Sequence, residues 1–209
     1  MKKLIVGSVC LALFAACASY GFAARKVSKN ETPASGDSSQ MKTVSANTLS
    51  NTTVFINFEK DTERYGVWQK DIKDPSQGIK YEIVSPGVDD RGKCVKLTYD
   101  VDSPNEAYCG FWMTINADLR EYKKLVFWAK GDKSAGFTST IKTELKNNME
   151  SSAPYTDKIT SRWTKIEIPL EDFNTITDWS KMIQFVVTFD SQVTQKTGVI
   201  YLDNIGFEK

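Results

Sequence analysis

The chain has 209 residues, of which 41% are hydrophobic and 25% are charged, a composition suited to one folded domain with additional segments. Its 27 basic and 26 acidic side chains nearly balance, so there is no basic field of the kind that binds nucleic acid. The absence of histidine from the sequence excludes Ser–His and Cys–His nucleophile pairs and histidine metal sites.

Residues 1–24 are typical of a signal peptide. Two lysines precede an apolar stretch over 4–16, which is too short for a convincing membrane span, and small residues offer cleavage sites after it. We therefore expect export to the periplasm, the outer surface or the medium. Cys17 leaves two interpretations open. Phe14–Cys17 resembles a bacterial lipobox, whose cysteine becomes a lipid anchor, or Cys17 is an ordinary residue of a cleaved peptide.

The next segment, 25–52, is polar and poor in large apolar side chains. Such a composition buries too little surface to offset the conformational entropy of the chain, and it predicts a flexible linker. A linker behind a lipid anchor would suit a protein displayed on a surface. A leader without a role is the alternative.

From residue 53 to the end, apolar and polar residues alternate, which indicates strands with one buried face. The alternating segments are 54–58, 94–101, 108–115, 137–146 and 183–190. Turn-forming residues separate them, and only 177–182 suggests a single helical turn. Repeated short strands without long helical patterns predict an all-β fold, an antiparallel β-sandwich over 53–209.

Three segments strengthen this expectation: Asp118–Gly131, Arg162–Phe173 and Thr197–Phe207. In this order they resemble the jelly-roll carbohydrate-binding modules of the galactose-binding-like superfamily, and the family 11 glucan-binding type in particular. The resemblance covers roughly residues 53–209. It implies a jelly-roll sandwich and a non-catalytic protein that binds a β-glucan or a related polysaccharide on a concave sheet face.

Sugar recognition requires aromatic rings that stack on pyranose faces and a few polar groups for the hydroxyls. The alternation places Tyr108 and Trp112 on the outward face of their strand, where we expect the two rings to serve adjacent sugar rings. Polar side chains on the corresponding faces of other strands would select the sugar. They are Lys142, Glu144, Gln184, Thr188 and Asp190. Two plainer interpretations stay open: a loop could cover both rings, and Lys142 could simply pair with Glu144.

The other large aromatic residues have structural interpretations. Trp128 lies in a run that is apolar on both faces and is expected in the core, and Trp163 resembles a structural residue of the family. Trp179 is expected to cap one end of the sandwich. Trp68 and Tyr155 fall in loop-like stretches and could flank a cleft.

The resembled modules often hold a structural calcium ion between the first and last strands. The matching residues are Glu59 and Asp203, with Asp89 or Asp90 as a third ligand. Calcium takes six to eight oxygens, so backbone carbonyls would have to complete the set. Without a cation the carboxylates would repel one another. The alternative is that Glu59 pairs with a lysine and Asp203 caps a turn.

Export allows a disulfide between Cys94 and Cys109, which would close a loop of about 15 residues and add roughly 3 kcal/mol. Two buried free thiols are the alternative. If the two strands formed a hairpin, Cys94 would lie nearer Thr114 than Cys109, which is an obstacle to the bridge.

Two rival functions remain. A structural or adhesive envelope protein could use the same fold for contacts with a protein partner. A glycoside-active enzyme would require two carboxylates, such as those of Glu144 and Asp190, about 5–10 Å apart across one cleft. We expect no catalysis, because no carboxylate pair lies in a recognisable motif.

Overall fold

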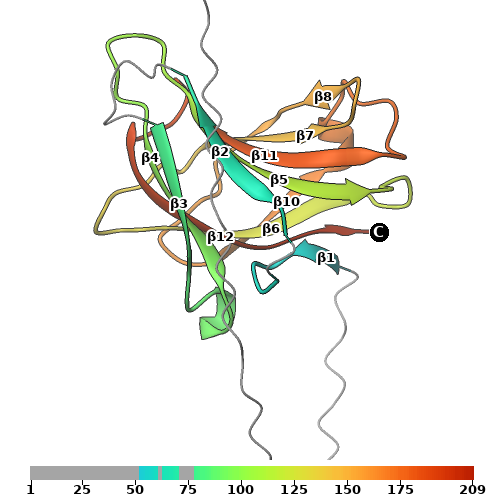
Figure 1. Cartoon of the computed structure of the whole chain (residues 1–209), viewed down its shortest axis with the longest axis horizontal. Coiled ribbons are helices and arrows are strands. Elements are labelled where there is room, and N and C mark those ends of the chain that lie inside the picture. Colours follow the sequence, from blue (N-terminus) through green and yellow to red (C-terminus); the bar gives the residue numbers. More distant parts are fainter. Residues whose placement is uncertain (1–51, 61–62, 71–77) are drawn as a thin grey trace, which may run out of the picture. The chain divides into compact units, whose positions relative to one another are not determined.

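The structure is a computed structural model that describes residues 52–60, 63–70 and 78–209. In these residues twelve strands form two six-stranded antiparallel sheets, which face each other as a jelly-roll β-sandwich (Figure 1). The predicted all-β fold is confirmed. The predicted signal peptide, Cys17 and all of the predicted linker except Thr52 lie outside the described residues. No helix in the described part of the chain is long and apolar enough to span a membrane.

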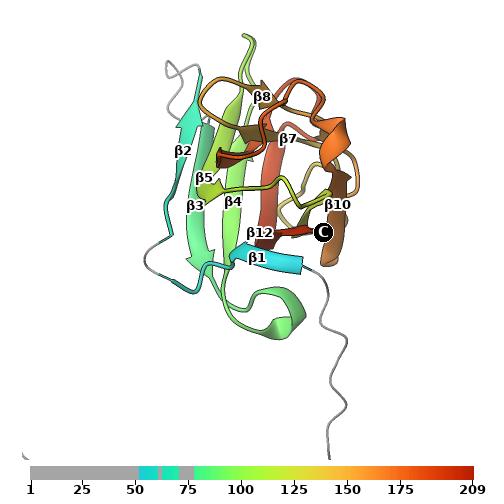
Figure 2. The ribbon, with the colours of Figure 1, turned by 90° about the vertical axis from the view of Figure 1, so that its right-hand side faces the viewer.

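The first sheet, sheet A, contains the C-terminal strand near its centre. Its order is β10 (Thr164–Pro169), β6 (Lys124–Gly131), β12 (Thr197–Glu208), β4 (Cys94–Asp100) and β3 (Gly78–Val84). The sixth strand, β1 (Thr52–Ile56), pairs with the last part of β12, beside the C-terminus (Figure 2).

The second sheet, sheet B, has the order β2 (Tyr65–Gln69), β5 (Cys109–Ala117), β11 (Met182–Phe189), β7 (Ile141–Lys146) and β8 (Ser151–Ser152). The short strand β9 (Tyr155–Thr156) also pairs with β7. Two 3-10 turns, η1 (Val88–Asp90) and η2 (Leu170–Asp172), complete the secondary structure of the described residues. The expected helical turn at 177–182 does not form.

Alternating apolar residues build the core between the sheets, as predicted. Tyr99 of β4 stacks on Phe189 of β11 at 4.1 Å, and Phe127 of β6 meets Phe185 of β11 edge to face at 5.5 Å. Each ring is at most 1% exposed. Burying a ring of this size contributes about 1.5–3 kcal/mol, so these contacts between the sheets are a major source of stability.

Cys94 and Cys109, the cysteines among the described residues, lie in different sheets, and both are buried and free. Cys94 begins β4 and Cys109 begins β5, and the expectation that these two strands form a hairpin is wrong. Strand β4 pairs with β3 and β12, whereas β5 pairs with β2 and β11. Burial raises the pKa of the Cys94 thiol to about 11 and that of Cys109 to about 12, so both thiols are protonated at neutral pH.

Candidate functional site

The outward face of sheet B carries the predicted sugar-binding residues. Trp112 lies on β5, opposite Val186 of β11, and Val186 in turn lies opposite Glu144 of β7. Thr188 is opposite Lys142 in the same ladder. The remaining predicted residues lie on or beside these strands: Tyr108, Gln184 and Asp190. Because these residues alternate with the buried ones, the sequence pattern placed them on one face correctly.

Two tryptophans on neighbouring strands lie over glycines. Gly66 of β2 is opposite Trp112, and Gly110 of β5 is opposite Trp68. A Cβ atom on Gly110 would lie 2.6 Å from the indole of Trp68, and one on Gly66 would lie 2.8 Å from the indole of Trp112. Each indole therefore uses the space that a side chain would fill on the opposite strand, and the two crossed Trp–Gly pairs form an aromatic shelf on sheet B.

Trp68 corrects two expectations. It lies on strand β2 and not in a loop. It also lies between the two predicted rings. Tyr108 and Trp112 are four positions apart, which is about 13 Å along a strand. Trp68 lies opposite Gly110, the residue midway between them. The Trp68 and Tyr108 rings meet edge to face at 5.5 Å. The expectation that Tyr108 and Trp112 serve adjacent sugar rings is thus replaced by a row of three rings.

A groove of about 290 Å³ begins beside this shelf. Its lining is Trp68, Glu106, Ala107, Tyr108, Lys142, Glu144, Ala153, Thr188, Asp190 and Ser191. Five predicted residues are among these, whereas Trp112 and Gln184 lie on the same face outside the groove. A second, polar hollow shares Lys142, Glu144 and Ala153 with the groove and continues to Asn174 and Thr175, beyond η2. The groove therefore has an aromatic end and a polar end.

Polar side chains in the groove are held by hydrogen bonds and ion pairs. Tyr155 of β9 donates its hydroxyl to Asp190 at 2.7 Å, and the Lys142 ammonium lies 5.6 Å from the Tyr155 ring. Burial, together with the Asp190 carboxylate, raises the pKa of Tyr155 to about 12. Glu144 pairs with Lys146 at 3.6 Å and not, as the plainer interpretation had it, with Lys142. Hydrogen-bonding groups are thus fixed beside aromatic rings, the combination that sugar recognition uses.

The family model for carbohydrate binding domain 30 matches residues 54–209. The chain belongs to the carbohydrate binding domain 30 family. The resemblance to jelly-roll carbohydrate-binding modules is thereby confirmed, with family 30 as the match. No curated protein sequence matches the chain.

Solved structures of carbohydrate-binding modules share the fold of this domain. The family 11 module of a cellulosomal cellulase of Clostridium thermocellum is 16% identical, with 76% of this chain and 95% of that chain covered and a TM-score of 0.59. A family 11 module from the same organism, in complex with a β-1,3-1,4-mixed-linked tetrasaccharide, is 17% identical, with 75% and 95% covered and a TM-score of 0.54. At these identities the likeness establishes the fold.

The outward face of sheet A has aromatic residues of its own. Trp128 is half-buried on this face, so its expected place in the core is wrong: only alternate residues of β6 point inward. Trp163 meets Tyr201 edge to face at 6.4 Å, and the Lys130 ammonium lies 5.0 Å and 4.7 Å from these two rings. The lysine thus covers aromatic surface that would otherwise face water.

The predicted calcium ligands lie beside η1. Glu59 and Asp203 line one hollow of about 220 Å³ together with Asn57 and Asp89, whereas Asp90 is exposed and does not line it. Asp203 is 3% exposed and accepts hydrogen bonds from the backbone N–H groups of Val88 at 2.9 Å and Asn204 at 2.7 Å. Among the described residues, no three acidic, cysteine or histidine side chains converge as a metal-binding group.

Basic residues line this hollow as well: Arg91 pairs with Asp89 at 3.5 Å, and the backbone N–H of Lys93 donates to the Glu59 carboxylate. Burial raises the pKa of the Asp203 carboxyl, and the nearby carboxylates of Glu59 and Glu63 raise it further. One carboxylate oxygen of Glu63 is buried without a hydrogen-bond partner. A cation between Glu59 and Asp203 would offset the burial of the Asp203 carboxylate, and backbone or water oxygens would have to supply its remaining ligands.

Proposed function

We propose that this protein is a non-catalytic, exported binder of β-glucan-type polysaccharide, and that the outward face of sheet B holds the glycan. The observation that carries the proposal is the aromatic shelf of Trp68 and Trp112. Both rings lie outside the buried core cluster, so the sandwich does not use them for packing. Flat rings beside hydrogen-bonding side chains suit the alternating apolar and hydroxyl surfaces of a pyranose chain.

The shape of the groove supports a polymer over a small ligand. The groove and the polar hollow share three residues, and together they extend from β2 across β5, β11 and β7 to the residues after η2. A family 11 module of the same fold was solved with a mixed-linked tetrasaccharide. By analogy, a linear β-glucan is the first ligand to test.

Two carboxylates of the groove are already engaged by other groups of the protein, which agrees with binding without catalysis. Glu144 is paired with Lys146, and Asp190 accepts hydrogen bonds from the Tyr155 hydroxyl and the Gln192 backbone N–H. A glycosidase needs one carboxyl group poised as an acid and a second as a nucleophile or base. Groups held in this way are better suited to orienting hydroxyls.

Affinity electrophoresis would test the proposal. Gels would contain mixed-linkage β-glucan, xyloglucan, hydroxyethylcellulose, xylan or galactomannan. We expect retardation by at least one glucan and about 30-fold weaker binding by Trp112→Ala, since an interface tryptophan is worth about 2 kcal/mol. Trp163→Ala, on the opposite sheet, is the matched control and should bind normally. Migration unchanged by every glycan would refute the proposal.

We also propose that calcium binds beside η1, with Glu59 and Asp203 as carboxylate ligands. Its contribution would be structural, because the ion would join the segment after β1 to β12 and neutralise a buried acidic group.

A further inference from the structure

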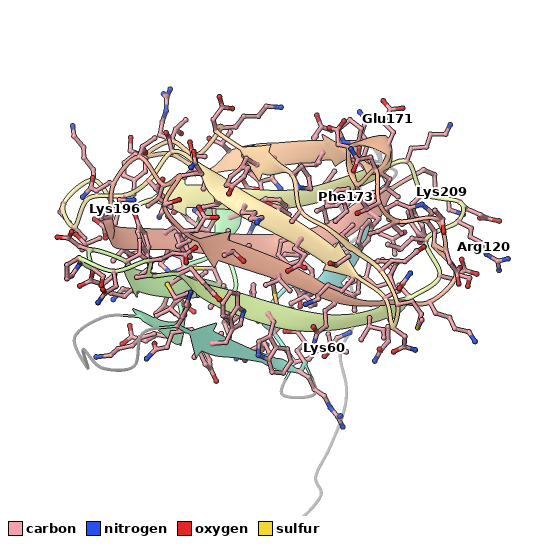
Figure 3. The ribbon with its side chains drawn as sticks, turned by 90° about the horizontal axis from the view of Figure 1, so that it is seen from above. Lys60, Arg120, Glu171, Phe173, Lys196 and Lys209 are labelled. Carbon is pink, nitrogen blue, oxygen red and sulfur yellow. The ribbon has the colours of Figure 1, made fainter. Side chains whose placement is uncertain are left out.

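A separate pocket of about 390 Å³ opens at one end of the sandwich. Its buried floor includes Leu119 and Phe173, and the half-buried rings of Tyr122 and Trp179 also line it. We call it the end pocket. Figure 3 shows Phe173 at this end of the molecule, far from Lys196 at the other end. The end pocket shares no residue with the groove beside Trp68 and Tyr108, but Asn174 also lines the polar hollow that continues that groove.

Exposed polar side chains surround this apolar floor. Arg120, Glu171 and Asn174 line the end pocket, and Figure 3 shows Arg120 and Glu171 at the same end of the sandwich. Arg120 forms an ion pair with Asp118 at 2.6 Å, so its charge is already balanced. The end pocket therefore presents hydrogen-bonding groups without an uncompensated positive charge at Arg120, which favours a neutral ligand over an acidic one.

The segment that carries Trp179 is fixed in place. The Glu150 carboxylate accepts hydrogen bonds from the backbone N–H groups of Thr177 at 2.9 Å and Asp178 at 3.1 Å. The Trp179 carbonyl accepts one from the Leu119 N–H at 2.8 Å. The Trp179 ring also meets Phe173 edge to face at 6.4 Å. A ring that is carried on a fixed backbone and packed against Phe173 loses little conformational entropy when it binds a ligand.

We propose that the end pocket is a second saccharide site, which takes one neutral sugar ring, such as the exposed end of a glycan chain. Its volume lies in the range of small-molecule sites, about 300–1,000 Å³. An apolar floor with aromatic walls would receive the apolar face of the ring, and the Asn174 amide and Glu171 carboxylate would pair with its hydroxyls. The site would be distinct from the aromatic part of the groove, and Asn174 lies where the polar hollow and the end pocket meet.

The test follows the indole N–H resonances of the ¹⁵N-labelled full chain during titration with glucose, galactose, mannose and cellobiose. The Trp179 resonance should shift saturably with at least one sugar, and equally in Trp112→Ala, which leaves the end pocket intact. Asn174→Ala changes an exposed side chain and should weaken this titration roughly 5-fold, the value of one hydrogen bond.

Three results would overturn the end-pocket proposal. They are no shift of the Trp179 resonance with any of the four sugars, a shift that disappears in Trp112→Ala, or an unchanged titration in Asn174→Ala. Failure of the groove to bind glycan would appear separately, as an absence of shifts at Trp68 and Trp112.

Discussion

Gly110→Ala tests whether the crossed Trp–Gly pairs create the binding surface. The added Cβ would lie 2.6 Å from three atoms of the Trp68 indole, whereas unstrained carbon contacts lie at about 3.5–4.0 Å. The indole must therefore move by about 1 Å or more. The backbone of Gly110 is in the ordinary extended region, so alanine meets no backbone strain, and its gain of about 0.5–1 kcal/mol in a strand should offset the cost of displacing the ring.

We expect Gly110→Ala to weaken glucan binding about 10-fold, measured by calorimetry, without lowering the melting temperature. A misplaced ring of this size costs about 1–2 kcal/mol of binding free energy. The decisive comparison is a double-mutant cycle with Trp68→Ala. Once the indole is absent, Gly110→Ala should have no further effect on affinity. Equal losses in both backgrounds, or full affinity of Gly110→Ala alone, would refute this reasoning.

Three other predictions concern stability. The Thr143 hydroxyl is buried without a hydrogen-bond partner, so Thr143→Val should raise the free energy of unfolding by about 1 kcal/mol and Tm by about 2–4 °C; a loss of stability on denaturant unfolding would contradict this. Hydrogen bonds from Thr177, Asp178 and Asn147 lower the pKa of Glu150 from 4.5 to about 2, so its stabilising effect is complete above pH 4.5 and is lost between pH 4.5 and 2. The Tm difference between wild type and Glu150→Gln should shrink over that window, and a difference that does not depend on pH would contradict the assignment. Calcium should raise Tm and a chelator should reverse the rise, but neither should affect Asp203→Asn; an equal rise in that variant would place the ion elsewhere.

Much of the fold could be predicted because a sandwich core requires strict alternation. Leu97 and Phe111 are buried where period two places them, and both strands are central in their sheets. The strands β2 and β3 were not predicted because they lie at sheet edges and bury little, which weakens the apolar pattern. In β11 a bulge between Met182 and Gln184 shifts the register, so Met182 is fully buried and Ile183, expected in the core, is only half-buried.

The candidate site was found in part. Strand alternation identifies the outward residues of β5, β7 and β11, but it says nothing about which strand lies beside β5. That pairing brings Trp68 over Gly110, and it depends on contacts between residues far apart in sequence. The signal that could have revealed it is a repeated triplet, because Gly66–Trp68 and Gly110–Trp112 both read Gly-x-Trp. When the middle residues of two such triplets pair in an antiparallel ladder, as Val67 and Phe111 do, each indole lies opposite a glycine.

The most direct test of the central claim uses the tryptophans as reporters during titration with a β-1,3-1,4-mixed-linked tetrasaccharide. Trp68 and Trp112 lie on the outward face of sheet B, and Trp128 and Trp163 on that of sheet A. We predict that the indole N–H resonances of Trp68 and Trp112 shift together with one dissociation constant while those of Trp128 and Trp163 stay fixed. Shifts confined to the sheet A tryptophans, or no shift at saturating oligosaccharide, would contradict the assignment of the glycan to sheet B.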